Sequence, residues 1–176
     1  MKIFSTKFKD LKIINTPIFK DNRGFFRELF KNKFFSKKKF VFTCLSSSKK
    51  NVLRGLHMQT SFPQGKYLSV IKGEIFDVAV DLRKKSKTFG KYFSIKLSDR
   101  NGFSLYIPEG FAHGFVGLKK ENIISYHCTN YRSKKHEIGI KWNDPDLNIN
   151  WPKGKLILSK KDKKNISFKK NLNNYE

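Results

Sequence analysis

The sequence predicts an all-β fold in which short antiparallel strands form a sandwich or barrel. Aromatic and β-branched residues recur in short runs that end at turn residues, a pattern typical of such folds. Strands do not alternate with long helical patterns, which argues against a Rossmann-type domain. Helical signals are weak and peripheral, and the 176 residues suit one domain with a proper core better than two.

The central strands follow from this pattern in chain order. They are expected at residues 67–71, 75–82, 92–97, 103–107, 115–118 and 123–128. The first two are separated by Lys72-Gly73-Glu74, and the third and fourth by Asp99-Arg100-Asn101-Gly102. Both separators contain the glycine, asparagine or aspartate residues that tight turns favour.

The two ends of the chain are less regular. Residues 21–28 predict a turn that enters an aromatic strand, and residues 28–38 and 160–165 predict short peripheral helices or turns. The residues after Ser167 are mostly polar, so we expect about 168–176 to be a loose polar tail. Since no repeat, linker or second domain is visible, we expect residues 1–176 to form a single domain.

The formal net charge of +24 normally raises nucleic acid or an acidic surface as a partner. The lysines are scattered, however, in small clusters at 37–39, 160–161 and 163–164, and their abundance equally fits a lysine-biased proteome. We interpret most of this charge as solvated surface and expect no nucleic-acid function. A subset should form a positive cleft that attracts a phosphorylated ligand.

Location follows from what the sequence lacks. It contains no apolar run long enough for a transmembrane helix, and its first residues do not resemble a signal peptide. Cys44 and Cys128 are too few and too widely spaced for a disulfide framework or a zinc site. We therefore expect a protein of the reducing cytoplasm without membrane association.

His113 belongs to the pattern Gly102-x5-Pro108-x-Gly110-x2-His113. This spacing resembles the second motif of the cupin superfamily, a double-stranded β-helix or jelly roll. Pro108 cannot donate to a central ladder and Gly110 relaxes the turn, so the strand reverses and His113 points into the barrel. The alternative is a buried structural histidine at a tight corner.

Metal binding is disfavoured by the first cupin motif. Metal-binding cupins carry a His-x-His pair and a carboxylate there, whereas this chain has His57-Met58-Gln59. His57 and His113 alone make a poor metal site, because three protein ligands are usual. We therefore predict a metal-free barrel.

His57 is the leading candidate for a general base. It lies in Arg54-Gly55-Leu56-His57, with Lys66 nine residues later, and an imidazole titrates near neutral pH. Lys66 and Arg54 would place positive charge where an enolate oxygen develops, although Lys66 could also be a surface lysine. A carboxylate should orient the imidazole. The candidates, among which the residues do not decide, are Asp77, Asp81 and Asp162.

Tyr126 is a candidate acid on the last predicted strand. Strand alternation places Tyr126 and Cys128 on one face and His127 on the other. An inward-facing phenol can donate a proton from the side opposite a histidine. A core tyrosine is the alternative.

Arg23 lies in the turn at 21–28 near the amino end. Its guanidinium could bind a phosphate through two parallel hydrogen bonds. A simple hairpin corner with a surface arginine is an equally good interpretation.

Several segments in matching order resemble the dTDP-4-dehydrorhamnose 3,5-epimerase family, over about residues 10–165. They are Asp21-x-Arg23-Gly24-x-Phe26-x-Glu28, Asn51-Val52-Leu53-Arg54-Gly55-Leu56-His57-x-Gln59, Gln64-Gly65-Lys66, Asp77-Val78-Ala79-Val80-Asp81-Leu82-Arg83, Ser86-x-Thr88-Phe89-Gly90, Ile107-Pro108-Glu109-Gly110-Phe111-Ala112-His113-Gly114-Phe115, Trp142-Asn143-Asp144-Pro145 and Leu158-Ser159-x-Lys161-Asp162. The resemblance implies a cofactor-independent, metal-free jelly roll. Its implied reaction inverts C3 and C5 of dTDP-4-dehydro-6-deoxy-D-glucose and gives dTDP-4-dehydro-L-rhamnose.

The resemblance also implies roles for individual residues. His57 matches the base, Asp162 its partner, Tyr126 the acid on the opposite face and Lys66 the residue that stabilises the enolate. The matching ligand-contact positions are Arg23, Glu28, Arg54, His113, Glu137 and Lys161. The family forms homodimers that exchange amino-terminal strands, so Arg23 and Glu28 are expected to serve the partner's site.

Three positions depart from the family pattern. A Gln-x-Asn pair is replaced by Phe42-Thr43-Cys44, and a tyrosine that stacks on thymine is replaced by Arg132, whose guanidinium plane can still stack on a base. One alternative is therefore a related 3-, 5- or 3,5-epimerase that acts on another nucleotide or a modified 4-keto sugar. A non-catalytic ligand-binding cupin is the other, although it would be expected to have lost His57, Tyr126 or Asp162.

Overall fold

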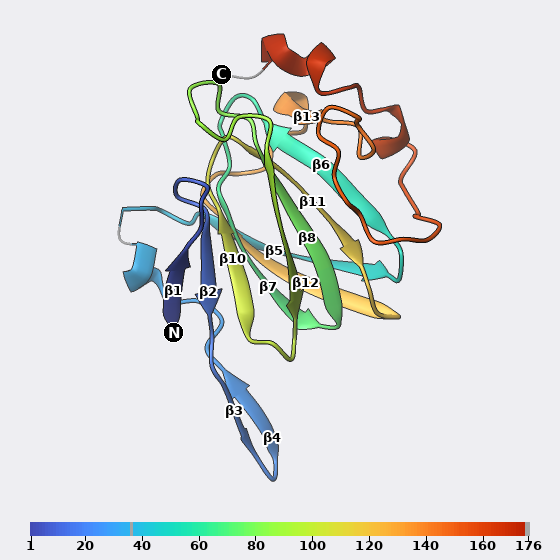
Figure 1. Cartoon of the computed structure of the whole chain (residues 1–176). Helices are drawn as coiled ribbons and strands as arrows, with labels where there is room; N and C mark the ends of the chain where they lie inside the picture. The colour runs from blue at the N-terminus through green and yellow to red at the C-terminus, as the bar shows by residue number, and fades with distance from the viewer. Residues whose placement is uncertain (36, 175–176) are drawn as a thin grey trace.

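Two antiparallel β-sheets pack face to face in the computed structural model, which describes residues 1–35 and 37–174 (Figure 1). One sheet has the strand order β1-β2-β10-β7-β12-β5 and the other β13-β6-β11-β8-β9, while β3 and β4 form a separate hairpin. This architecture confirms the predicted all-β, cupin-like class.

The strand bounds are β1 Lys2–Ser5, β2 Lys12–Asn15, β3 Ile18–Asp21, β4 Gly24–Arg27, β5 Phe42–Lys49, β6 Leu53–Gln59, β7 Lys66–Lys72, β8 Glu74–Asp81, β9 Tyr92–Ser98, β10 Phe103–Ile107, β11 Phe111–Gly117, β12 Glu121–Cys128 and β13 Glu137–Gly139. Helical structure in the described residues is limited to the 3-10 segments η1 Asn32–Phe35, η2 Lys134–His136, η3 Asp162–Lys164 and η4 Lys169–Asn174. None of these helices is long and apolar enough to cross a membrane.

The predicted central strands correspond to β7 through β12, and the peripheral helices to η1 and η3. The strand predicted at 115–118 is longer, because β11 begins directly after the Pro108-Gly110 corner and includes His113. The prediction of a loose tail is wrong for residues 168–171, since Phe168 and Asn171 are buried. Residues 175–176 lie outside the described residues.

Apolar side chains form two layers, one on each face of the second sheet. Alternation along β8 directs Ile75 and Ala79 between the sheets, and Val78 and Val80 to the outer face. The carboxy-terminal segment covers that outer face, because Trp151 and other apolar residues of the segment pack on it. The second sheet is therefore buried on both faces and forms a rigid base for the side chains that it directs inward.

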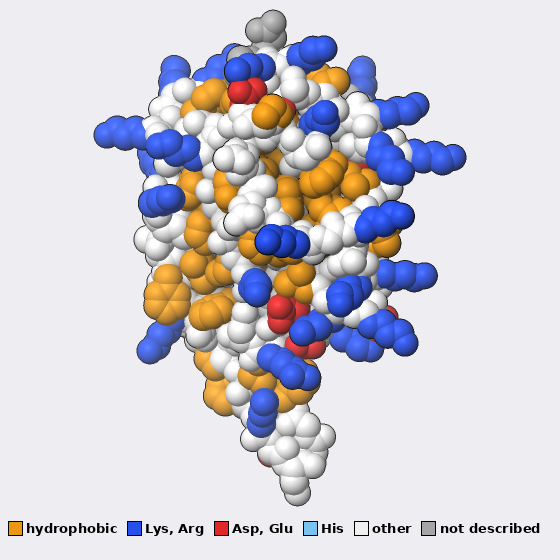
Figure 2. All heavy atoms as spheres, turned by 45° about the vertical axis from the view of Figure 1, so that its right-hand side comes forward, with side chains coloured by type: hydrophobic (Ala, Val, Ile, Leu, Met, Phe, Trp, Pro, Cys, Tyr) orange, Lys and Arg blue, Asp and Glu red, His pale blue; other side chains and the backbone are white. Residues whose placement is uncertain are grey.

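The β3–β4 hairpin points away from the sandwich (Figure 1). Its apolar side chains Phe19, Phe25 and Phe26 are exposed. Lysine and arginine side chains project all around the visible face in Figure 2 instead of gathering in one patch. This distribution agrees with the interpretation of most of the +24 charge as solvated surface.

Candidate active site

A cavity of about 610 Å³ opens between the two sheets. Its walls come from β5, β7 and β12 of the first sheet and from β6 and β11 of the second, and the segment 157–162 completes it. Alternation along the strands decides which side chains reach it. The predicted site residues that line it are Arg54, His57, Lys66, His113, Tyr126, Arg132, Glu137, Lys161 and Asp162.

An extra residue in β6 explains the spacing of Arg54 and His57. His57 lies opposite His113 and Arg54 opposite Phe115, so three steps along β6 match two steps along β11. This β-bulge turns Arg54 and His57 to the same face of the sheet, toward the cavity. Gly55, at φ +115°, occupies the bulge, and a Cβ there would lie 2.5 Å from the carbonyl oxygen of His113.

His57 is paired with Asp162, as the resemblance implies. Nε2 of His57 lies 2.6 Å from Oδ1 of Asp162, while the hydroxyl of Ser159 donates to Oδ2 at 2.9 Å. The backbone N–H of Leu53 in β6 donates to the carbonyl of Ile157, whose own N–H donates to the carbonyl of Asn51, and these bonds hold the segment beside the start of the strand. Burial would raise the pKa of Asp162, but the hydrogen bond and charge of His57 lower it below its usual range.

Tyr126 and Lys66 lie on the opposite wall. Tyr126 is confirmed on the inward face of β12, and its hydroxyl lies 3.2 Å from the hydroxyl of Ser46. His127 points to the other face, where it stacks on Phe30. Burial raises the pKa of Tyr126, which keeps its phenol protonated, and burial lowers the pKa of Lys66 below the ordinary lysine value.

His113 faces the cavity with a buried partner of its own. Its Nε2 lies 2.8 Å from Oδ2 of Asp77, whose side chain is fully buried. Oδ1 of Asp77 has no hydrogen-bond partner among the described residues. Asp77, one of the candidate partners for His57, therefore orients His113 instead.

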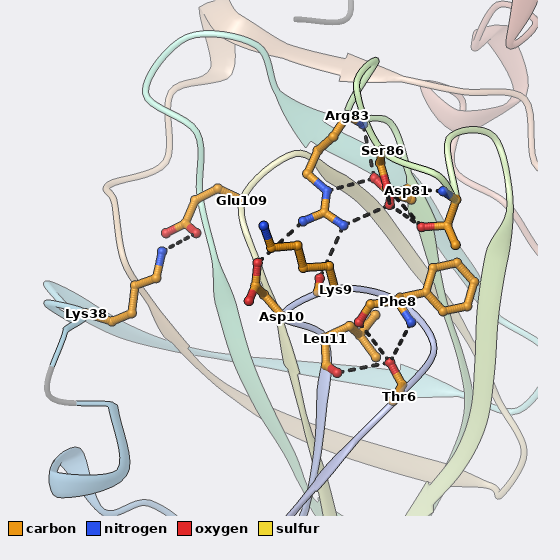
Figure 3. A network of polar contacts seen from close by, with 11 residues as sticks. Thr6, Phe8, Lys9, Asp10, Leu11, Lys38, Asp81, Arg83, Ser86 and Glu109 are labelled. Carbon is orange, nitrogen blue, oxygen red and sulfur yellow. Dashed lines mark hydrogen bonds and ion pairs between the residues drawn. The ribbon is translucent and has the colours of Figure 1, made fainter.

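Asp81, the third candidate partner, lies outside the cavity. It accepts hydrogen bonds from Arg83, Ser86 and Thr88 at 2.6 to 2.9 Å. Figure 3 shows Arg83 and Ser86 converging on its carboxylate, which ties the end of β8 to the following loop. Asp81 thus has a structural role.

Charged residues surround the mouth of the cavity. Glu137 accepts hydrogen bonds from Arg132 and from Lys161. Burial alone would raise the pKa of Glu137, but these two bonds lower it to about 2. Arg54 donates to Ser48 at 2.8 Å and to the carbonyl of Ser47 at 2.9 Å. Among the described residues, four basic side chains thus line the cavity, those of Arg54, Lys66, Arg132 and Lys161.

Arg23 and Glu28, also predicted to contact the ligand, do not reach this cavity. Arg23 lies at the tip of the β3–β4 hairpin and pairs with Asp21, while Glu28 pairs with Lys31. In one chain by itself, Arg23 is therefore a surface arginine at the corner of a hairpin.

The positions that depart from the family pattern do lie at the site. Phe42 and Cys44 line the cavity from β5, and Tyr131 stacks on Phe42 with ring centroids 5.9 Å apart. Sequence reasoning missed Ser46 and Ser159, which contact Tyr126 and Asp162. Serine is common on surfaces and in turns, and the only available signal was the position of Ser159 three residues before Asp162.

Within the described part of the chain, no group of three His, Cys, Asp or Glu side chains is arranged to hold a metal ion. The geometry instead offers a histidine–carboxylate pair, a lysine and a tyrosine around one cavity. Such a set can remove a proton beside a carbonyl and return it from another direction.

Comparison with known proteins agrees with this geometry. The family model for dTDP-4-dehydrorhamnose 3,5-epimerase matches residues 5–170. The chain belongs to the dTDP-4-dehydrorhamnose 3,5-epimerase family. Curated members from Methanothermobacter thermautotrophicus and Shigella flexneri are 44% and 46% identical to it, over 92% of this chain and 91% and 93% of their own.

Solved structures of this epimerase family share the fold. The enzyme from Legionella pneumophila, crystallised with dTDP-4-keto-L-rhamnose, is 43% identical with a TM-score of 0.91, over 94% of this chain and 92% of its own. The enzyme from Elizabethkingia anophelis is 42% identical with a TM-score of 0.89, over 97% of both chains. The departures at Phe42, Cys44 and Arg132 thus occur in a chain that otherwise matches the family along nearly its whole length.

Proposed function

We propose that this protein is a cofactor-independent epimerase that converts dTDP-4-dehydro-6-deoxy-D-glucose to dTDP-4-dehydro-L-rhamnose by inverting C3 and C5. The observation that carries the proposal is the His57–Asp162 pair in one cavity with Tyr126 and Lys66. Both carbons flank the C4 ketone, which acidifies their protons, so the reaction needs a base, an acid and a stabilised enolate.

His57 is the proposed base. A carboxylate only accepts hydrogen bonds, so the hydrogen between His57 and Asp162 lies on Nε2 and the lone pair of Nδ1 remains available. When Nδ1 takes the substrate proton, the ionised Asp162 stabilises the imidazolium that forms. Ser159 holds the carboxylate for this task.

Lys66 and Tyr126 are the proposed partners of the base. The ammonium of Lys66 stabilises the negative charge that develops on the C4 oxygen, in a site where burial strengthens the interaction. Burial keeps the phenol of Tyr126 protonated, so it can deliver a proton to the other face of the enolate. Removal on one face and return on the other inverts the carbon.

The remaining cavity residues are proposed to hold the nucleotide and the sugar. Arg54, Arg132 and Lys161 supply positive charge for a diphosphate, and His113 supplies an imidazole whose orientation Asp77 fixes. Support comes from the Legionella enzyme, whose structure contains dTDP-4-keto-L-rhamnose.

Solvent exchange tests the proposal. The protein is incubated with dTDP-4-keto-6-deoxy-glucose in deuterated water, and NMR locates the deuterium. Exchange at both C3 and C5 is expected, and His57→Ala should slow it about 100-fold or more. Full exchange by His57→Ala would contradict the mechanism, and a folded protein that binds the sugar without any exchange would favour the non-catalytic cupin.

A second candidate is an epimerase of one carbon or of another nucleotide sugar. The observation that favours it is the changed cavity wall at Phe42, Cys44 and Arg132. Exchange at one carbon alone would support a mono-epimerase. Faster turnover with a different base on the diphosphate would support a changed nucleotide.

We also propose a homodimer in which the β3–β4 hairpins are exchanged, so that Arg23 and Glu28 reach the partner's cavity. Neither residue lines the cavity of its own chain, and this fact and the exposed phenylalanines of the hairpin support the arrangement. We further propose that residues 1–176 form one domain, because residues from along the chain contribute to the same apolar layers. We also propose a cytoplasmic location, because free cysteines such as Cys44 and Cys128 suit a reducing compartment.

A further inference from the structure

Two thiols that the proposed mechanism does not use lie in the wall of the cavity. Cys44 is on β5 and Cys128 on β12, and these strands pair antiparallel with Cys44 opposite Tyr126 and Cys128 opposite Phe42. Both side chains point to the cavity. The thiols are therefore diagonal neighbours on one face of a strand pair, and they are the only cysteines of the chain.

The two thiols differ in accessibility. Cys44 is exposed, whereas Cys128 is buried. Burial raises the pKa of Cys128 to about 12, and the neighbouring Cys44 adds to the shift while Lys66 opposes it. Since the thiolate is the reactive form, Cys44 should react first and Cys128 second.

The charge around the pair selects an anionic reagent. Arg132 and Lys161 lie at the mouth of the same cavity, and Lys66 is the register partner of Cys128 on β7. A low-molecular-weight disulfide that carries carboxylates, such as oxidised glutathione, would be attracted to this opening. Neutral reagents would lack that attraction.

We propose that Cys44 is a thiol-modification site for low-molecular-weight disulfides and that Cys128 resolves the adduct. The Cys44 thiolate attacks one sulfur of the disulfide and releases one thiolate, which leaves a mixed disulfide on Cys44. The Cys128 thiolate then attacks the Cys44 sulfur, forms the Cys44–Cys128 disulfide and releases the second thiolate. The two protein thiols lose two electrons and the small disulfide gains them.

The strand arrangement permits this closure. Diagonal neighbours on one face of an antiparallel pair have Cβ atoms up to about 7–8 Å apart, so a disulfide requires the strands to shift locally. Among the described residues of one chain, β5 is the edge strand of its sheet and pairs with β12 alone. The shift would occur beside Tyr126 and Lys66, so we expect it to lower the activity, an effect that rests on the proposed function.

Intact-mass measurement of the native protein after addition of oxidised glutathione tests the site without any substrate. The wild type should pass through a glutathionyl adduct to a product lighter than the reduced chain by two hydrogens. Cys128→Ser should stop at the adduct, and Cys44→Ser should react at least about ten times more slowly. If Cys128→Ser folds poorly, Cys128→Ala serves instead.

Two outcomes would overturn the proposal. Modification of Cys44→Ser at the wild-type rate would show that Cys44 is not the entry point, and a wild type that stops at the adduct would remove the role of Cys128. Deuterium exchange before oxidation, after it and after dithiothreitol treatment then measures the effect on catalysis. A protein inactive before oxidation contradicts the proposed function alone, since the mass readout is independent of it.

Discussion

At the scale of single residues, the site depends on how carboxylates hold its two cavity-facing histidines. His57 and His113 are register partners on β6 and β11, yet each has its own acidic neighbour. Asp162 reaches His57 from a 3-10 segment near the cavity, while Asp77 reaches His113 from the adjacent strand β8. Two neighbouring imidazoles are thereby given separate orientations and can take separate roles.

Asp162→Asn tests the pair at His57. The amide can donate to Nε2, which would place the imidazole hydrogen on Nδ1 and remove the basic nitrogen. We expect kcat to fall by about 10²- to 10⁴-fold with a small change in KM, as measured by steady-state turnover. Ser159→Ala is the matched control and should cost much less, because it loosens the carboxylate without removing it. Equal losses in the two variants would argue against this role of Asp162.

Glu137 provides a pH prediction for stability. Its pKa falls from the usual 4.5 to about 2 in the folded protein, so its ionised form stabilises the fold above pH 4.5. That contribution is lost as the pH falls through the folded pKa near 2. Glu137→Gln should therefore destabilise the protein by about 1–3 kcal/mol at pH 6 and by little near pH 2. Denaturant unfolding at both pH values measures this, and a pH-independent difference would contradict it.

At the scale of elements, the bulge in β6 is the feature that assembles the site. Because it adds one residue between Arg54 and His57, both side chains face the cavity, while Leu53, Leu56 and Met58 face the outer core. A regular strand would point either Arg54 or His57 away from the substrate.

Gly55→Ala should disrupt this bulge. A Cβ at Gly55 meets the carbonyl oxygen of His113 at 2.5 Å, and φ is +115°. We expect a loss of about 2–4 kcal/mol in unfolding free energy, together with reduced activity. Gly154→Ala is the control, since Gly154 has φ +130° but nothing within 4 Å of an added Cβ. Similar losses in both variants would mean that backbone strain alone, without the contact to β11, explains the effect.

The elements also show how far sequence reasoning reaches. β7 to β12 were predictable because their apolar runs are clear, and Tyr126 was placed on the correct face by alternation alone. β1, β2, β3, β5, β6 and β13 were missed. β1, β2, β3 and β13 have only three or four residues each, while polar residues in β5 and the glycine in β6 interrupt the apolar pattern. Asp162 could not be chosen from the residues alone, because it pairs across 105 positions and only the family resemblance selected it.

At the scale of the whole molecule, the projecting hairpin and the cavity belong to different parts of the chain. If the hairpins are exchanged in a homodimer, each site combines His57 of one protomer with Arg23 of its partner. A homodimer of either variant, Arg23→Ala or His57→Ala, is then expected to be inactive, because both of its sites lack one of these residues. When the two variants are mixed and allowed to re-associate, about half of the dimers contain one protomer of each kind. One of the two sites in each mixed dimer is intact, so the mixture should recover up to about a quarter of wild-type activity. Absence of recovery, with mixed dimers verified by mass, would contradict the exchange.

The net charge of +24 should affect substrate capture rather than the chemical step. Added salt screens the attraction between the cationic cavity and a nucleotide diphosphate. We expect KM to rise about 3- to 10-fold between low and high salt while kcat changes little. Arg132→Gln should show a weaker salt dependence, and a kcat that falls as steeply as KM rises would argue against this view.

The sequence distance between His57 and Asp162 has a consequence for how the protein becomes active during its synthesis. β6, which carries the imidazole, leaves the ribosome 105 residues before the carboxylate that pairs with it. The nascent chain therefore passes through a stage at which strands can already pair but the imidazole is unpartnered. On the role proposed for the pair, the site is complete only after the segment 157–162 has been synthesised and lies beside β6.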